Sequence, residues 1–317
     1  MKDLASQLAQ VQTVAVAGHV RPDGDCIGSC LATYNYISTW FPNIQVDLYL
    51  EPIPNIFKFL KNSDKIRSTF ENNQIYDLCI VQDCGDPGRL GAAVKYFETA
   101  KRTICIDHHI SNQSFADENY IFPQVSSTSE LIFELLEEER ITKEIAECIY
   151  VGILHDTGVF QYSSTTAKTM NTAGVLMEKG INFSKIVDDT FYTKTFQQNQ
   201  IMGQALLNSR LLLDGLVIAT TISQEEMARF QVLPKHLEGI VSQLRVTKGV
   251  EAAIFLYENE DHTWKLSMRS NGKADVAAIA VKYGGGGHVR AAGATMEGDP
   301  WGIISKICKE IEGQQHD

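Results

Sequence analysis

The stretch Val14-Ala-Val-Ala-Gly-His19-Val-Arg-Pro-Asp23-Gly-Asp25 joins an apolar run to a polar loop that holds one imidazole and two carboxylates. An apolar run of this length predicts a strand buried on both faces, as in a parallel sheet. In open α/β sheets, ligands bind at the carboxyl ends of such strands. The stretch therefore predicts an α/β fold with a parallel sheet, and it places His19, Asp23 and Asp25 where ligands bind.

Three later segments repeat this arrangement of an apolar run followed by side chains that can bind metal. The run 78–81 precedes Asp83, the run 104–106 precedes Asp107, His108 and His109, and the run 149–154 precedes Asp156. A half-buried carboxylate is costly unless a cation compensates its charge. Oxygen and imidazole ligands without thiolate suit a hard-to-borderline divalent ion, and two such ions can share a bridging carboxylate and a bridging water. The pattern predicts a two-metal hydrolase.

Several of these side chains also have a purely structural interpretation. Asp25 is suited to cap the helix that follows it, and Asp156 is suited to end a helix. We assign Asp86 and His155 to such structural roles. The two imidazoles and the carboxylate of 107–109 leave one strand together, which suits metal ligation with a neighbour that orients a ligand.

The chain of 317 residues with a net charge of −11 constrains its partners. This length predicts two domains. Neutralisation of phosphates supplies most of the affinity for long nucleic acid, so an acidic chain is a poor partner for it. We expect no long duplex nucleic acid as partner, and we expect any phosphorylated substrate to be small.

The cysteines and the apolar runs indicate where in the cell the protein is expected. No apolar stretch approaches the roughly 20 residues that span a bilayer, so we expect no membrane partner. The chain has seven cysteines, an odd number, and no CxxC pair. A reducing cytoplasm is the simplest interpretation.

Alternating strand-like and helix-like segments organise both halves of the chain. Expected strands are 13–18, 45–50, 77–82, 103–106, 216–221, 252–257 and 264–269. Expected helices are 26–39, 87–98, 128–140, 143–156, 225–230, 274–283 and 301–310. We predict a domain over 1–190, a connecting helix over 191–209, and a smaller α/β domain over 210–317, with a cleft between the domains. The apolar helices near 170–210 are compatible with a homodimer.

The motifs, taken in order, resemble those of the DHH phosphoesterase family. They are H-x-x-x-D-x-D at 19–25, D-x-x-D at 83–86, D-H-H at 107–109 and D-T-G at 156–158. The stretch Gly284-Gly-Gly-Gly-His288-Val-Arg290-Ala-Ala-Gly293 resembles the glycine-rich signature of the DHH-associated domain. By layout the chain is similar to the compact NrnA-like members, which are nanoRNases and phosphatases of 3′-phosphoadenosine 5′-phosphate (pAp).

This resemblance implies a role for each motif residue. One metal ion would be held by His19, Asp23 and Asp83, and the other by Asp25, Asp83, His108 and Asp156, with Asp83 as the bridge. His109 would contact the scissile phosphate and assist the leaving oxygen as an acid. Asp107 would orient a histidine. The resemblance implies two divalent ions and favours Mn²⁺.

The second signature implies a site for the rest of the substrate. Successive glycines let a backbone approach an anion closely, and a forked guanidinium suits a phosphate. Arg269 matches an arginine that contacts the far phosphate of the substrate in this family. The implied substrate-binding residues are Arg269, Gly284, Gly285, Gly286, Gly287, His288 and Arg290.

The expected activity is hydrolysis of short 5′-phosphorylated oligonucleotides to nucleoside monophosphates, together with dephosphorylation of pAp to AMP. One alternative is a phosphodiesterase specific for linear dinucleotides (pApA or pGpG) from cyclic-dinucleotide turnover. Another is a nucleotide-sensing module without catalysis, which is disfavoured because every motif ligand is present. The glycine-rich signature disfavours a manganese-dependent pyrophosphatase, and the acidic charge disfavours a processive exonuclease.

Overall fold

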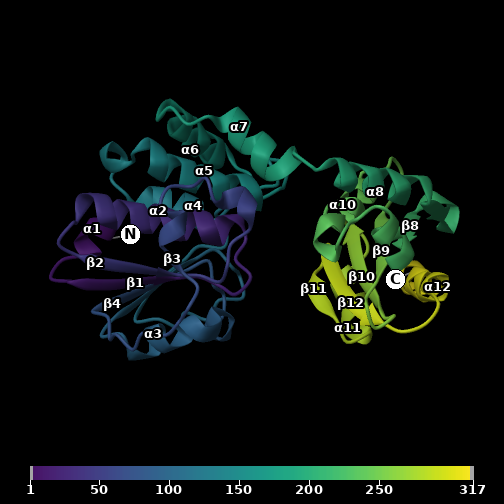
Figure 1. The fold of residues 1–317 in the computed structure, drawn as a ribbon, viewed down its shortest axis with the longest axis horizontal. Helices are drawn as coiled ribbons and strands as arrows, with labels where there is room; N and C mark the ends of the chain where they lie inside the picture. Colours follow the sequence, from purple (N-terminus) through teal and green to yellow (C-terminus); the bar gives the residue numbers. More distant parts are fainter. Residues whose placement is uncertain (1–2, 315–317) are drawn as a thin grey trace. The chain divides into compact units, whose positions relative to one another are not determined.

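The computed structural model describes residues 3–314 and divides the chain into two compact units (Figure 1). One unit runs to Thr193 and the other begins at Lys194. Each unit has its own sheet and its own hydrophobic cores, which confirms the α/β fold expected for both. Along residues 3–314 no helix has the length and apolar character needed to cross a membrane.

The N-terminal sheet is parallel throughout its described pairs and has the strand order β3-β2-β1-β4-β5-β6. Its strands are β1 (Thr13–Ala17), β2 (Gln45–Tyr49), β3 (Ile66–Arg67), β4 (Leu78–Gln82), β5 (Thr103–Asp107) and β6 (Glu118–Ile121). The order reverses between β1 and β4, which makes their carboxyl ends the topological switch point where such sheets bind ligands. β4 and β5 are buried along their whole length, as their apolar sequences predicted.

Helices cover both faces of this sheet. The helices of this unit are α1 (Leu4–Gln7), α2 (Gly24–Trp40), α3 (Val94–Thr99), α4 (Thr128–Leu135), α5 (Lys143–Asp156), α6 (Ala167–Glu178) and α7 (Phe183–Val187). Figure 1 shows α2 and α4 on one face and α3 on the other. α5 packs on α2 and α4 rather than on the strands, so it forms a further layer.

Two glycines allow the backbones of α2 and α5 to approach closely. A Cβ atom at Gly28 would lie 2.4 Å from the backbone oxygen of Cys148. A Cβ atom at Gly152 would lie 1.8 Å from Ser129 Oγ and 2.7 Å from Asp25 Oδ1. This contact brings the start of α2, which carries Asp25, next to the C-terminal half of α5.

Some elements differ from the sequence-based expectations. The helix expected over 128–140 ends at Leu135, and a separate 3₁₀ turn spans Glu138–Arg140. The helix expected over 87–98 begins as a 3₁₀ segment that is interrupted at Gly91, where φ is 54°. Strand β6 was not expected, because its polar sequence lacks an apolar run.

The C-terminal unit holds a mixed sheet of order β11-β12-β10-β9-β8-β7, in which β8 and β9 are parallel and the other pairs are antiparallel. Its strands are β7 (Arg210–Leu212), β8 (Val217–Ile222), β9 (Ala252–Glu258), β10 (Trp264–Ser270), β11 (Gly286–His288) and β12 (Ala291–Met296). Its helices are α8 (Phe196–Leu207), α9 (Gln224–Arg229), α10 (Ile240–Arg245), α11 (Val276–Lys282) and α12 (Pro300–Gly313). The glycine-rich stretch, for which no strand was expected, contributes β11 at the sheet edge.

We predict that Gly152→Ala destabilises the N-terminal unit, because the new methyl group overlaps Ser129 and Asp25. Overpacking of this kind costs about 1–3 kcal/mol. The matched control is Gly174→Ala in α6, where a Cβ atom meets nothing within 4 Å. Alanine there is expected to stabilise the helix by about 0.5–1 kcal/mol. Urea unfolding of both variants checks the prediction, which fails if they shift stability in the same direction.

Candidate metal centre

The expected ligands come together at the switch point of the N-terminal sheet. His19 follows β1, Asp83 follows β4, and His108 follows β5. Asp25 lies in the first turn of α2, and Asp156 is the last residue of α5. Four separate segments of the chain therefore contribute one cluster of imidazoles and carboxylates.

Asp83 lies at the middle of this cluster, and its two oxygens face opposite sides. Oδ2 lies 3.5 Å from Nε2 of His19, which in turn lies 3.7 Å from Oδ2 of Asp23. Oδ1 lies 3.7 Å from Nε2 of His108. The same His108 nitrogen lies 3.4 Å from Asp156 and 3.9 Å from Asp25. The side chains thus form two groups that share Asp83, which is the arrangement that two ions with one bridging carboxylate need.

The backbone at Asp83 is held in an uncommon conformation. Its φ is 52°, in the left-handed region that non-glycine residues rarely adopt. Its N–H donates to the carbonyl oxygen of Ile106 on β5 at 3.1 Å. Backbone conformations of this kind cluster at functional sites, where the surrounding structure holds them in place.

Asp25 is buried and is bound by the start of α4. Its Oδ2 accepts the backbone N–H of Thr128 at 2.7 Å, and its Oδ1 accepts that of Ser129 at 2.9 Å. The cap of α2 is instead Asp23, whose Oδ1 accepts the N–H groups of Asp25 and Cys26. The capping role considered for Asp25 therefore belongs to Asp23, and the Asp25 carboxylate points into the cluster.

The cluster concentrates buried negative charge. Burial and the charges of Asp83 and Asp156 hold the pKa of Asp25 well above its usual range. Burial and the charges of Asp83 and Asp23 raise the pKa of Asp156 to about 8. Burial disfavours the charged imidazole of His19, but hydrogen bonds to Asp23 and Asp83 raise its pKa to about 11. Buried carboxylates in this number call for compensating cations, so the residues fit the divalent ions that the motifs imply.

His109 is positioned separately from His108. Its Nδ1 lies 2.7 Å from Oδ1 of Asp107, a fully buried carboxylate whose other oxygen accepts the Asn112 side chain at 2.7 Å. The hydrogen bond to Asp107 raises the pKa of His109 to about 9, although burial opposes it. Since Asp107 holds Nδ1, the other ring nitrogen is the one available to a substrate. No sequence motif marks Asn112, so its contact with Asp107 was not expected.

The two residues assigned to structural roles lie outside these groups. His155 packs against Phe57, and its Nε2 lies 3.0 Å from Thr190 Oγ1. Oδ1 of Asp86 accepts the N–H of Gly88 and caps the adjoining 3₁₀ segment.

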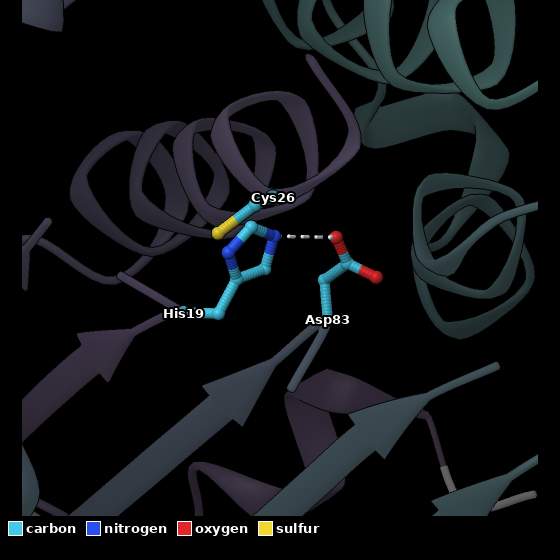
Figure 2. A group of neighbouring side chains, drawn as sticks. All are labelled: His19, Cys26 and Asp83. Carbon is cyan, nitrogen blue, oxygen red and sulfur yellow. Dashed lines mark ion pairs between the residues drawn. The ribbon is translucent and has the colours of Figure 1, made fainter. Parts of the chain in front are cut away.

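The structure also brings a thiol to the cluster. Figure 2 shows Cys26, from the first turn of α2, beside His19 and Asp83. Its Sγ, a ring nitrogen of His19 and a carboxylate oxygen of Asp83 lie within 4.8 Å of one another. No role was expected for Cys26, because a cysteine in an apolar helix is usually a small core residue.

Two of the expected substrate-binding residues, Arg269 and His288, lie on one face of the C-terminal sheet. Arg269 on β10 pairs with Ala291 on β12, and Ala291 pairs with His288 on β11. Directly paired residues share a face, so Arg269 and His288 lie on the same face with one small residue between them, and their strands are separated by about 10 Å. Both side chains are accessible. Arg290 lies exposed in the turn between β11 and β12.

The four glycines serve different purposes. A Cβ atom at Gly285 would lie 2.1 Å from the oxygen of Gly293, and one at Gly287 would lie 2.4 Å from that of Ala291. The hairpin packing therefore requires both. Gly284 and Gly286 face open space, and only these two leave room for an approaching anion.

Comparisons with known proteins match both units of the chain. The family model described as DHH family, N-terminal domain matches residues 13–153, and the DHHA1 domain matches 216–315. The Bifunctional oligoribonuclease and PAP phosphatase NrnA of Thermus thermophilus is 28% identical over 302 residues, covering 94% of this chain and 89% of that protein. The uncharacterized protein MG371 homolog of Mycoplasma pneumoniae is 30% identical over 93% of this chain and 90% of its own length. An exopolyphosphatase-related protein from Bacteroides fragilis has a similar structure, with a TM-score of 0.89 and 27% identity over 98% of this chain and 94% of that one.

We predict that metal binding to the metal-free protein releases protons and strengthens as the pH rises. Asp156, with a pKa of about 8, and His19, with a pKa of about 11, both hold protons at neutral pH, and a metal ion must displace them. Each displaced proton makes the affinity rise about tenfold per pH unit below the pKa of its group. Calorimetry in buffers of different ionisation enthalpy measures the number released. Asp156→Asn should release about one proton fewer, and a binding enthalpy that is independent of the buffer would contradict the prediction.

Proposed function

Because the chain belongs to the DHH phosphoesterase family and is a hydrolase, we propose that it cleaves short 5′-phosphorylated oligonucleotides with two divalent metal ions. The observation that carries the proposal is the position of Asp83, whose two oxygens face His19 on one side and His108 on the other. A shared carboxylate between two ligand groups is the arrangement of two-metal phosphoester hydrolysis. We further propose that the chain removes the 3′-phosphate of pAp.

The residues divide the chemistry between them. Two divalent ions bound here would supply an activated water and would neutralise charge on the phosphoryl oxygens. The carboxylates of Asp83, Asp25 and Asp156 would bind the two ions. His109, protonated at neutral pH by its contact with Asp107, would donate its proton to the leaving oxygen.

The substrate class rests on the relatives and on the C-terminal sheet. The Thermus thermophilus relative is named for action on oligoribonucleotides and PAP, and it aligns over both units of this chain. The row Arg269–Ala291–His288 offers two donors to a terminal phosphate, with a small residue between them that leaves room for a nucleotide. Arg290 and Gly286 would add contacts beside this row.

The net charge, the donor atoms and the cysteines support the substrate length, the metal and the cellular location that we propose. A net charge of −11 disfavours long polyanions and favours substrates of a few nucleotides. Mn²⁺ suits the oxygen and imidazole donors. Every cysteine is buried and unbridged in the described part of the chain, as a reducing cytoplasm would leave them.

We expect a 5′-labelled RNA ladder from dinucleotides to about ten nucleotides to be cleaved fastest at its shortest members, because the acidic chain repels longer ones. pAp should yield AMP in the same Mn²⁺ buffer. Asp83→Ala should lower both rates by at least about 10³-fold, since it removes the ligand that both ions share. The matched control is Asp86→Asn, which keeps a side-chain cap for Gly88 and should retain activity. Turnover of pyrophosphate instead, or binding without turnover, contradicts the proposal; cleavage of dinucleotides alone would favour the narrower specificity.

We expect Arg269→Gln to raise the KM for 5′-phosphorylated dinucleotides by about 10–100-fold, because charge-assisted hydrogen bonds to phosphate contribute about 1.5–3 kcal/mol. The value of kcat should change little. Arg269→Lys should recover only part of the loss, since lysine lacks the guanidinium fork. The control is Arg245→Gln, which removes an exposed guanidinium bound to Asn271 in the same unit. Dinucleotides without a 5′-phosphate should not distinguish Arg269→Gln from wild type, and an equal loss on them would contradict the assignment.

A further inference from the structure

The run Ser126-Ser-Thr-Ser-Glu130 is polar in every position and is nevertheless buried in every position. Burying polar groups is costly unless each finds a hydrogen-bond partner. Neither the sequence motifs nor the proposed mechanism gives this run a role. Its partners therefore indicate what it does.

One half of the run fixes the start of α4. Ser127 Oγ accepts the N–H of Glu130 at 3.1 Å and caps the helix. The buried carboxylate of Glu130 in turn accepts hydrogen bonds from the hydroxyl groups of Ser126 and of Thr169, the latter on α6 at 2.9 Å. The first turn of α4 is thus anchored to α6 as well as to its own cap.

The other half of the run contacts the candidate ligands. The backbone N–H of Thr128 donates to Asp25 Oδ2 at 2.7 Å, and its hydroxyl donates to Asp83 Oδ1 at 3.1 Å. Ser129 contacts the Asp25 carboxylate through its backbone N–H, at 2.9 Å. Thr128 is thus bound to two carboxylates of the cluster, to Asp25 through its backbone and to Asp83 through its side chain.

We propose that Thr128 is a positioning residue that fixes the orientation of Asp83 relative to Asp25, and thereby the separation of the two metal ions. The proposal rests on the proposed two-metal function and assigns a residue to that site. The hydroxyl holds the Asp83 oxygen that faces His108, so its loss frees that carboxylate to rotate toward His19. The ion bound by Asp25, His108 and Asp156 should then be the one that weakens.

Thr128→Val tests this inference, because valine keeps the shape and the backbone N–H and removes only the hydroxyl. Losing a partner that orients a metal ligand costs about 10–100-fold in metal affinity. We expect the first Mn²⁺ ion to bind as in wild type and the second to bind about 10–100-fold more weakly. Electron paramagnetic resonance should show the spin-coupled Mn²⁺ pair of the wild type only at higher Mn²⁺ in the variant. Thr128→Ser should restore the wild-type titration.

The control is Thr220→Val in the C-terminal unit, which removes an equally buried hydroxyl that donates to the Ala205 carbonyl. It should lose a similar amount of stability and keep the wild-type Mn²⁺ titration. Thr128→Ala serves if valine prevents folding, since alanine also keeps the backbone contact to Asp25. A wild-type titration in folded Thr128→Val or Thr128→Ala overturns the inference and leaves the two-metal function intact. A wild-type protein that binds no Mn²⁺ pair would instead refute the two-metal function itself.

Discussion

Buried negative charge at the carboxyl ends of β1, β4 and β5 is the constraint on which the site depends. The strand order reverses between β1 and β4, and this reversal opens the edge of the sheet to ligands. Asp83 stands at that point with both oxygens turned toward imidazoles. Such a group of carboxylates is stable only with compensation from hydrogen-bond donors, from protons or from cations. The elements around the cluster supply the hydrogen-bond donors among these three kinds of compensation.

The helices supply the fixed part of that compensation. The start of α4 directs two N–H groups at Asp25, a location where the helix dipole also favours negative charge. α2 and α5 approach closely through Gly28 and Gly152, and this contact brings Asp25 and Asp156 toward the same histidine. The parallel sheet brings the loops after its strands to one edge. The helices then fix the positions of the Asp25 and Asp156 carboxylates at that edge.

Apolar runs and the positions of their ends made part of this structure predictable from the sequence. Strands β1, β4 and β5 were expected, and so was the convergence of His19, Asp83 and His108, because parallel strands end at one edge. The role of run 126–130 was not predictable, since serine and threonine are usually exposed and only tertiary packing buries them here. The position of Cys26 was also not expected. Its apolar helix indicated a core residue, whereas the fold places its thiol close to His19. The strand β11 was missed because four glycines carry no pattern of side chains.

The negative charge of the chain and that of the candidate centre act together on an approaching phosphate. The chain carries a net charge of −11, and its candidate centre adds a local excess of carboxylates, so a phosphate approaching the metal-free cluster meets repulsion. Divalent ions are the largest local charges that such a site can hold, and they reverse the sign of its field. Arg269 and His288 lie on the sheet of the other unit, in one row across its strands. Under the proposed function, a phosphorylated substrate would approach the N-terminal cluster only once divalent ions have reversed this field.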